Sequence, residues 1–210
     1  MLSNLCMRDR DVRERLYRQV RAIYAQEPDT RFISELVLNR GAARIDLAVI
    51  NGRLHGYEIK SDADTLDRLS TQIEAYDSVF DEITIVVGVR HLARAEDLIP
   101  RWWGIMRAES YAGGVELSVL RNPETNPRQS GRAVAELLWR DEAMALLRRY
   151  SITKGLAKLN RTLLAEKIDE LLDRSIVFAF TREALKARVG WRVDEQQTLC
   201  DGLFPPVARL

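Results

Sequence analysis

Two runs of apolar residues flank a single turn signal, and they constrain the fold more than any other part of the chain. The runs cover residues 43–50 and 54–60, are rich in Ile, Val and Leu, and are separated by Asn51-Gly52. Asn-Gly between such runs is typical of a β-hairpin. Two acids and a lysine, Asp46, Glu58 and Lys60, stand inside the two strands. An unpaired charge is costly to bury, so this hairpin predicts a site.

Lys60 stands out because nearly every basic residue of the chain is arginine. Of 32 basic residues only five are lysines: Lys60, Lys154, Lys158, Lys167 and Lys186. Before residue 154 there are 21 arginines and one lysine. Arginine stays protonated at any working pH, whereas the pKa of a lysine can be lowered until it holds or deprotonates a water. The position of Lys60 therefore indicates a chemical role.

The order of predicted elements gives a mixed α/β fold. Apolar residues at helical spacing predict an amphipathic helix over residues 8–27. Residues 32–38 predict a short second helix that carries Glu35. The hairpin follows, then a helix that begins after Asp64, then a continuously apolar strand over residues 83–88. Helix, hairpin, helix and buried strand form the predicted core around a mixed central sheet.

The rest of the chain divides at a turn-rich segment. A helix at 91–99 and strands at 104–109 and 115–121 would extend the sheet. Residues 122–131 have the composition of a linker. We therefore expect a main domain over residues 1–125 and a helical C-terminal module over residues 126–210, with helices near 132–149, 151–172 and 181–190.

Whether the hairpin forms a site depends on its register. Side chains alternate along a strand, so Glu58 and Lys60 point to the same face. Asp46 must join them there. A plain two-residue turn on Asn51-Gly52 would set Asp46 opposite Tyr57 and turn Glu58 to the far side. That register would destroy the site.

A three-residue loop over residues 50–52 would instead keep Asp46 and Glu58 together in one site. With Gly52 in the left-handed conformation, this loop pairs Asp46 with Gly56 and makes Asp46 and Glu58 diagonal neighbours on one face. A bulge at Gly56 would have the same effect. Small Gly56 beside Asp46 would leave room for a metal ion or a phosphate. We predict the bulged register.

The ligand types indicate a hard cation. Carboxylate oxygens without nearby histidine or thiolate favour Mg²⁺ or Mn²⁺ over zinc. The chain has two histidines, and its two cysteines have no cysteine neighbour. Such an ion stabilises charge on a phosphate and lowers the pKa of an attacking water, and Lys60 would orient that water. The hypothesis is a Mg²⁺-dependent hydrolase of phosphodiester bonds.

This pattern resembles the PD-(D/E)XK, or restriction-endonuclease-like, nuclease superfamily, whose signature is an acid on one strand and Glu-x-Lys on the next. Ile45 stands where the superfamily's name has proline. The resemblance implies that Asp46 and Glu58 bind the metal ion, that Lys60 is the catalytic lysine, and that the Ile59 carbonyl is a backbone ligand. It also implies a restriction-endonuclease-like core and a nucleic-acid substrate, with DNA expected.

Three further residues extend the resemblance. Glu35 stands where many members place an extra acid before the strands, which implies a metal ligand. Gln72 and Tyr76 are similar to the Gln-x-x-x-Tyr motif of the RecB-type branch, where they lie beside the active site and the DNA backbone. One turn apart, they share a helix face. The resemblance covers about residues 10–90 and extends to uncharacterised bacterial proteins predicted to be nucleases.

Other interpretations remain open at this stage. Asp46 could be an edge-strand charge, Glu35 a solvated helical acid, and Gln72 with Tyr76 the rim of an amphipathic helix. The rival function is a catalytically inactive member of the same fold that serves as a nucleic-acid-binding or assembly subunit. The C-terminal module is faintly similar to SAP-type DNA-binding modules, whereas apolar residues 176–180 favour a helical lid or a homodimer surface.

Location and partners follow from composition. The net charge of +1 means that any nucleic-acid contact must come from local clustering of charge. Cys6 and Cys200 form no metal or disulfide pattern and favour a reducing compartment. The first residues lack the apolar run of a signal peptide, and no stretch approaches the ~20 apolar residues of a membrane span. We expect a cytoplasmic protein with no membrane partner.

Overall fold

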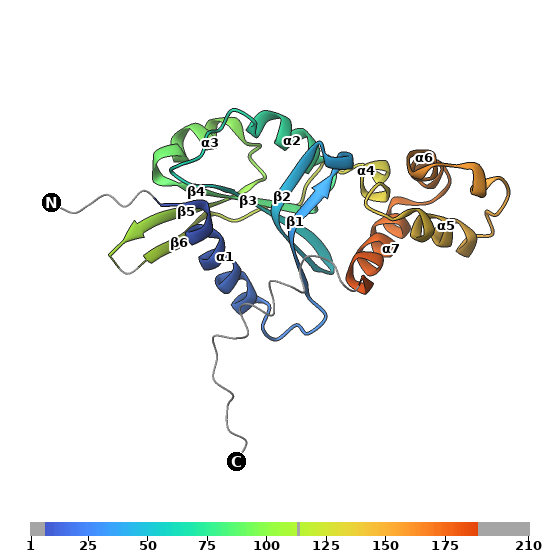
Figure 1. Cartoon of the computed structure of the whole chain (residues 1–210), viewed down its shortest axis with the longest axis horizontal. Helices are drawn as coiled ribbons and strands as arrows, with labels where there is room; N and C mark the ends of the chain where they lie inside the picture. Colours follow the sequence, from blue (N-terminus) through green and yellow to red (C-terminus); the bar gives the residue numbers. More distant parts are fainter. Residues whose placement is uncertain (1–6, 113, 189–210) are drawn as a thin grey trace, which may run out of the picture.

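The computed structural model describes residues 7–112 and 114–188, and one six-stranded sheet forms its centre (Figure 1). The strands follow in spatial order β1 to β6, and only the β3–β4 and β4–β5 pairs are parallel. This confirms a mixed α/β fold. The strands are β1 (Arg31–Leu38), β2 (Ala43–Asn51), β3 (Arg53–Lys60), β4 (Glu82–Gly88), β5 (Gly104–Tyr111) and β6 (Gly114–Arg121).

Helices cover both faces of this sheet. Helix α1 (Asp9–Ile23) lies on one face, while α2 (Leu69–Asp77) and α3 (Leu92–Leu98) lie on the other (Figure 1). The buried residues of α1 are Val12, Leu16 and Val20, which follow the helical spacing of the predicted amphipathic helix. These residues pack in one apolar cluster with Tyr57 and Ile59 of β3.

The second predicted helix is wrong, because residues 31–38 form strand β1 at the edge of the sheet. The physical reason is a break at Glu35, whose φ of 55° lies in the left-handed region. Ile33 and Leu36 pack in the same core cluster although they are three residues apart. The break thus interrupts the alternation of buried and exposed residues along the strand, and the buried residues then follow a spacing that resembles that of a helix.

The tip of the β2–β3 hairpin is also tighter than predicted. Asn51 pairs with Arg53, and Gly52 alone stands at the tip with a φ of 60°. Glycine adopts this conformation without steric cost. The predicted loop over residues 50–52 is therefore wrong, although Gly52 has the left-handed conformation that we expected.

This tighter tip changes what lies opposite Asp46. The last β2–β3 pair is Leu47 with Tyr57, so continuing the register sets Asp46 directly opposite Glu58 rather than Gly56. The shift is by two residues, so strand alternation alone would keep Asp46 on the face of Glu58. Alternation fails here, because Ile45 packs in the same core cluster as Ala48 and Ile50, while the Asp46 carboxylate meets Arg13 of α1. The ladder ends at this point, and β2 and β3 separate where the two acids stand.

Helix α2 begins later than predicted. Asp64 accepts hydrogen bonds from the backbone N–H and the hydroxyl of Ser61, at 2.8 and 2.6 Å. These bonds close a turn directly after β3. The helix starts only at Leu69, so its first turn lies beyond this loop.

The remaining helices form their own apolar cluster beside the sheet (Figure 1). The segment before them is no free linker, because the Asn126 amide donates 2.7 Å hydrogen bonds to the carbonyls of Asp77 and Phe80. Leu137 and Leu185 join the core of the sheet. The helices are α4 (Gly131–Ala135), α5 (Arg140–Arg149), α6 (Arg161–Leu171) and α7 (Arg174–Ala187). The predicted 132–149 helix is thus split in two, the predicted 151–172 helix begins later, and the last helix begins earlier than expected.

Two predictions about compartment meet the structure only in part. Within residues 7–112 and 114–188, no helix has the length and apolar character needed to cross a membrane. Cys6 and Cys200 lie outside the described residues. The same holds for residues 1–6, where we expected no signal peptide.

Candidate active site

A buried ion pair on β3 forms the centre of the site. Glu58 and Lys60 are 2% and 7% exposed, and Lys60 Nζ donates a 2.6 Å hydrogen bond to Glu58 Oε1. Both side chains lie on the face of the sheet that α2 covers, as strand alternation predicted. Charged side chains this buried are rare unless they are paired, and here each supplies the other's partner.

Helix α2 supplies the remaining partners of Glu58. Gln72 donates to Glu58 Oε1 at 2.7 Å and to the Tyr76 hydroxyl at 3.0 Å. That hydroxyl lies 2.7 Å from both Glu58 Oε2 and the Arg44 carbonyl oxygen. Because a hydroxyl has one proton, it can donate to one of these acceptors at a time. The sequence spacing that put Gln72 and Tyr76 on one helix face therefore brings both to the site.

These surroundings change the protonation of Glu58. Its pKa is raised from 4.5 to about 7, first by burial and then by the negative charge of Asp46, against the opposing effects of Lys60 and of the Tyr76 hydrogen bond. Burial and the nearby Glu58 also raise the pKa of Tyr76. When Glu58 is protonated, it can donate to Tyr76 while Tyr76 donates to Arg44. A second cation near Glu58 would favour its charged form.

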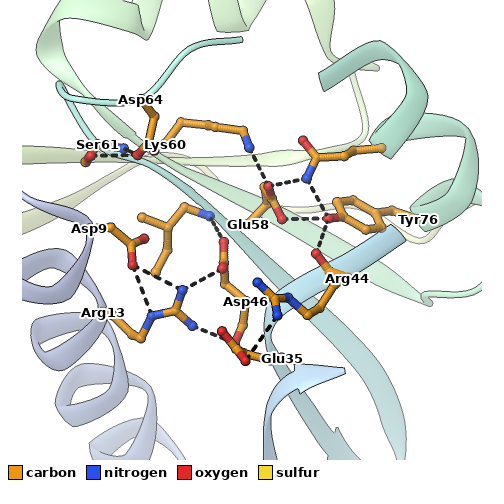
Figure 2. Close-up of polar contacts among 12 residues, drawn as sticks. Asp9, Arg13, Glu35, Arg44, Asp46, Glu58, Lys60, Ser61, Asp64 and Tyr76 are labelled. Atoms are coloured by element: carbon orange, nitrogen blue, oxygen red, sulfur yellow. Dashed lines mark hydrogen bonds and ion pairs between the residues drawn. The ribbon is translucent and has the colours of Figure 1, made fainter. Parts of the chain in front are cut away.

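Asp46 lies where β2 and β3 separate, and it is more open, with a side chain 19% exposed (Figure 2). Its Oδ2 accepts a 2.7 Å hydrogen bond from the Ile59 backbone N–H, so it takes the place of the missing ladder bond. Its Oδ1 lies 2.7 Å from Nη2 of Arg13 on α1. The structure thus brings the predicted residues Asp46, Glu58, Ile59 and Lys60 together.

Glu35 lies in β1 at the position opposite Asp46, although no backbone pair forms there. Its carboxylate forms an ion pair with Arg44 at 3.4 Å (Figure 2). Among the described residues, no group of three or more His, Cys, Asp or Glu side chains is arranged to hold a metal ion. Glu35 is therefore a neighbour of Asp46 in the sheet, and the structure does not join the three carboxylates into one ligand set.

Gly56 has a different role from the one predicted. A Cβ at this position would collide with the Ile45 side chain and lie 3.1 Å from the Phe80 ring. The missing side chain makes room for core packing between the sheet and the segment after α2. Space for a metal ion or a phosphate does not come from Gly56.

The residues present fit a hard divalent ion. Mg²⁺ commonly takes one or two protein carboxylates and completes its octahedron with water and substrate phosphate. Asp46 and Glu58 supply two carboxylates, close enough for the charge of one to raise the pKa of the other. In addition, Gln72 Oε1 is buried and has no hydrogen-bond partner within the described part of the chain, so it could accept from a water held at the site.

The predicted site did not include a residue of α1. The guanidinium of Arg13 contacts both the carboxylate and the backbone carbonyl of Asp46, at 2.7 and 3.2 Å. The same group contacts Asp9 one turn earlier at 3.2 Å. The available signal was that Arg13 follows Val12 and lies beside the buried stripe, while Asp9 precedes it by four residues.

Known proteins identify the family of this chain. The family described as bacteriophage P4 protein cII matches residues 10–196. Protein cII of enterobacteria phage P4 is 30% identical over 125 residues, which are 60% of this chain and 47% of that protein, so the chain spans about half the length of this curated relative. A solved protein of unknown function from Silicibacter pomeroyi is similar with 21% identity and a TM-score of 0.36, over 50% of this chain and 69% of that one, which is too weak a likeness to support an argument. The chain belongs to the bacteriophage P4 protein cII family.

Proposed function

We propose that this protein is a metal-dependent nuclease that hydrolyses phosphodiester bonds, with DNA as its substrate. The proposal includes a restriction-endonuclease-like core of the PD-(D/E)XK type, formed by the sheet with α1 and α2. One observation carries it: the buried Glu58–Lys60 pair lies just past the last β2–β3 pair, where continuing the register sets Asp46 opposite Glu58. A purely structural ion pair would not need a second carboxylate beside it, because that charge raises the pKa of Glu58.

Each residue has a distinct proposed role. Asp46 and Glu58 bind Mg²⁺ or Mn²⁺, with the Ile59 carbonyl as a backbone ligand and Glu35 as an additional acid near it. The bound ion would supply a Lewis acid and a water of lowered pKa. Lys60 orients the attacking water and offsets negative charge that develops on the phosphate. Gln72 and Tyr76 hold the Glu58 carboxylate, which fixes the direction in which it meets the ion.

The test is cleavage of plasmid and oligonucleotide DNA with Mg²⁺ or Mn²⁺. Wild type should cut, while Asp46→Ala and Lys60→Ala should lose at least about a hundredfold in rate, since each removes a group that acts in the transition state. An RNA oligonucleotide of the same sequence tests the choice of DNA. Equal activity in all three proteins would remove the basis of the proposal.

A second candidate is a catalytically inactive protein of the same fold that binds nucleic acid or serves as an assembly subunit. The observation that favours it is the pairing of each acid with a cation of the chain, Asp46 with Arg13 and Glu58 with Lys60. Calorimetric titration separates the two functions. The nuclease should bind Mn²⁺ in a way that Asp46→Ala abolishes, whereas the assembly subunit should show no such binding.

We propose that the C-terminal helices α4–α7 contact nucleic acid, and that the protein acts in the cytoplasm. Formation of a homodimer through these helices is the alternative use of the same surface. Basic residues gather around the connection between α5 and α6: Arg148, Arg149, Lys154 and Lys158. Phosphate contacts release counterions, so affinity falls with salt. Lys154→Gln combined with Lys158→Gln should reduce the salt dependence of DNA binding without changing metal binding at Asp46.

A further inference from the structure

Arg13 occupies an unusual position for a helix arginine. Its side chain is 24% exposed and reaches from α1 to the sheet, where Nη2 and Nη1 contact the carboxylate and the backbone carbonyl of Asp46 (Figure 2). With the Ile59 N–H on the other oxygen, both carboxylate oxygens of Asp46 have partners within the chain. A cation that approaches Asp46 therefore meets a guanidinium already in contact with it.

Each acid at the site already has a cation before any ion binds. Asp46 pairs with Arg13, and Glu58 pairs with Lys60. A divalent ion would add two positive charges beside these two cations. Like charges within a few ångströms repel strongly in a partly buried setting, so the ion and Arg13 oppose each other at Asp46.

Arg13 also has a second acid to hold. Asp9 lies one helical turn earlier, and its Oδ2 is 3.3 and 3.2 Å from Nε and Nη2 of Arg13. Burial raises the pKa of Asp9, and so do the charges of Asp46 and Asp64, which shows that these acids are near one another. The guanidinium can thus remain bound to α1 when it leaves Asp46.

We infer that Arg13 is a competitor built into the fold: it holds Asp46 in the ion-free protein, weakens the binding of divalent ions, and transfers to Asp9 when an ion binds. This inference rests on the proposed function, because it concerns the same metal site. It assigns to α1 a positioning residue that sets the affinity of the site, and it makes Asp9 the acceptor that allows the exchange.

The test is calorimetric titration of the full chain with Mn²⁺. Arg13→Gln should bind Mn²⁺ about tenfold more tightly than wild type, because it removes a positive charge beside Asp46. Asp9→Asn should bind several-fold more weakly, because Arg13 then has only Asp46 to hold. Arg10→Gln is the matched control on the same helix, since Arg10 is exposed and pairs with Glu14, and its affinity should not change.

The opposite signs expected for the first two variants separate this role from a structural one, which would weaken binding in both. Urea unfolding of each variant checks that the fold is intact. If wild type binds Mn²⁺ through Asp46 and Arg13→Gln binds equally or more weakly, the inference is overturned and the metal site stands. If wild type and a folded Arg13→Gln both fail to bind Mn²⁺, the proposed function fails together with the inference.

Discussion

The two faces of the sheet hold their charged residues in different ways. On the α2 face, Glu58 and Lys60 are buried and satisfied by one another and by α2. On the α1 side, Asp46 is more exposed and forms an ion pair with Arg13. Burial raises the pKa of Glu58, whereas partial exposure leaves Asp46 accessible. The difference teaches that, under the exchange of Arg13 proposed above, one part of the site is fixed and the other is exchangeable.

The largest expected effect comes from breaking the buried pair. Lys60→Met at pH 8 should lower the free energy of unfolding by about 3–5 kcal/mol, because it leaves the buried Glu58 carboxylate without its cation, and that carboxylate must then stay uncompensated or take up a proton. Urea unfolding measures this. The double variant Glu58→Gln with Lys60→Met should recover most of the loss, since no buried charge remains. A loss below about 1 kcal/mol for the single variant would mean that Glu58 is not confined as described.

The next effect is a pH dependence that belongs to Glu58. Its pKa is raised from 4.5 to about 7, so between these pH values the folded protein binds a proton that the unfolded chain has released. The contribution of Glu58 to stability should therefore fall as pH rises through this window, by up to about 3 kcal/mol at ~1.4 kcal/mol per pH unit. Buried His55, whose pKa is lowered from 6.5 to about 3, contributes the opposite slope below pH 6.5, so the Glu58 contribution is read from the difference between wild type and Glu58→Gln. Urea unfolding of both from pH 4.5 to 8 measures it, and a difference that does not change with pH would refute the raised pKa.

Removing one hydroxyl from the α2 face should have a smaller effect. Tyr76→Phe leaves a buried acceptor, Glu58 or the Arg44 carbonyl, without its donor, which costs about 1–3 kcal/mol. Tyr111→Phe is the control, because Tyr111 is 60% exposed, and it should change stability by less than about 0.5 kcal/mol. Thermal or urea unfolding of both variants decides whether the Tyr76 hydroxyl supports the site.

The smallest effect is expected on the α1 side. Arg13→Gln should cost about 1 kcal/mol of stability, since its ion pairs with Asp9 and Asp46 are partly exposed to water. Arg10→Gln should lie within about 0.5 kcal/mol of wild type. A cost for Arg13→Gln near that of Lys60→Met would show that the two faces do not differ, and the division into fixed and exchangeable parts would be wrong.

Much of the sheet could be predicted from local patterns. Apolar runs gave β2 to β6, and the Asn51-Gly52 turn gave the hairpin. Strand β1 could not be recognised, because the left-handed residue Glu35 interrupts its alternation. The register was wrong for a related reason: whether a glycine turn closes on one, two or three residues depends on how the strands pack, and local sequence does not specify it.

The candidate site could be predicted in part. Glu58, Lys60, Gln72 and Tyr76 come together because strand alternation and helix spacing determine which faces they share, and Asp46 reaches them through its bond with the Ile59 N–H. The contact of Arg13 with Asp46 could not be predicted, since it joins residues 33 positions apart through the packing of α1 on the sheet. The role of Gly56 was missed for the same reason, because Phe80 approaches it from a distant segment.

The most direct test of the central claim is a crystal of the wild-type protein soaked in Mn²⁺ and measured for anomalous scattering. The claim is that Asp46 and Glu58 share one divalent ion. It predicts a single strong peak about 2.1 Å from an oxygen of each carboxylate, with Arg13 moved onto Asp9. Soaked crystals with no peak at either carboxylate, and with Arg13 still on Asp46, would contradict it.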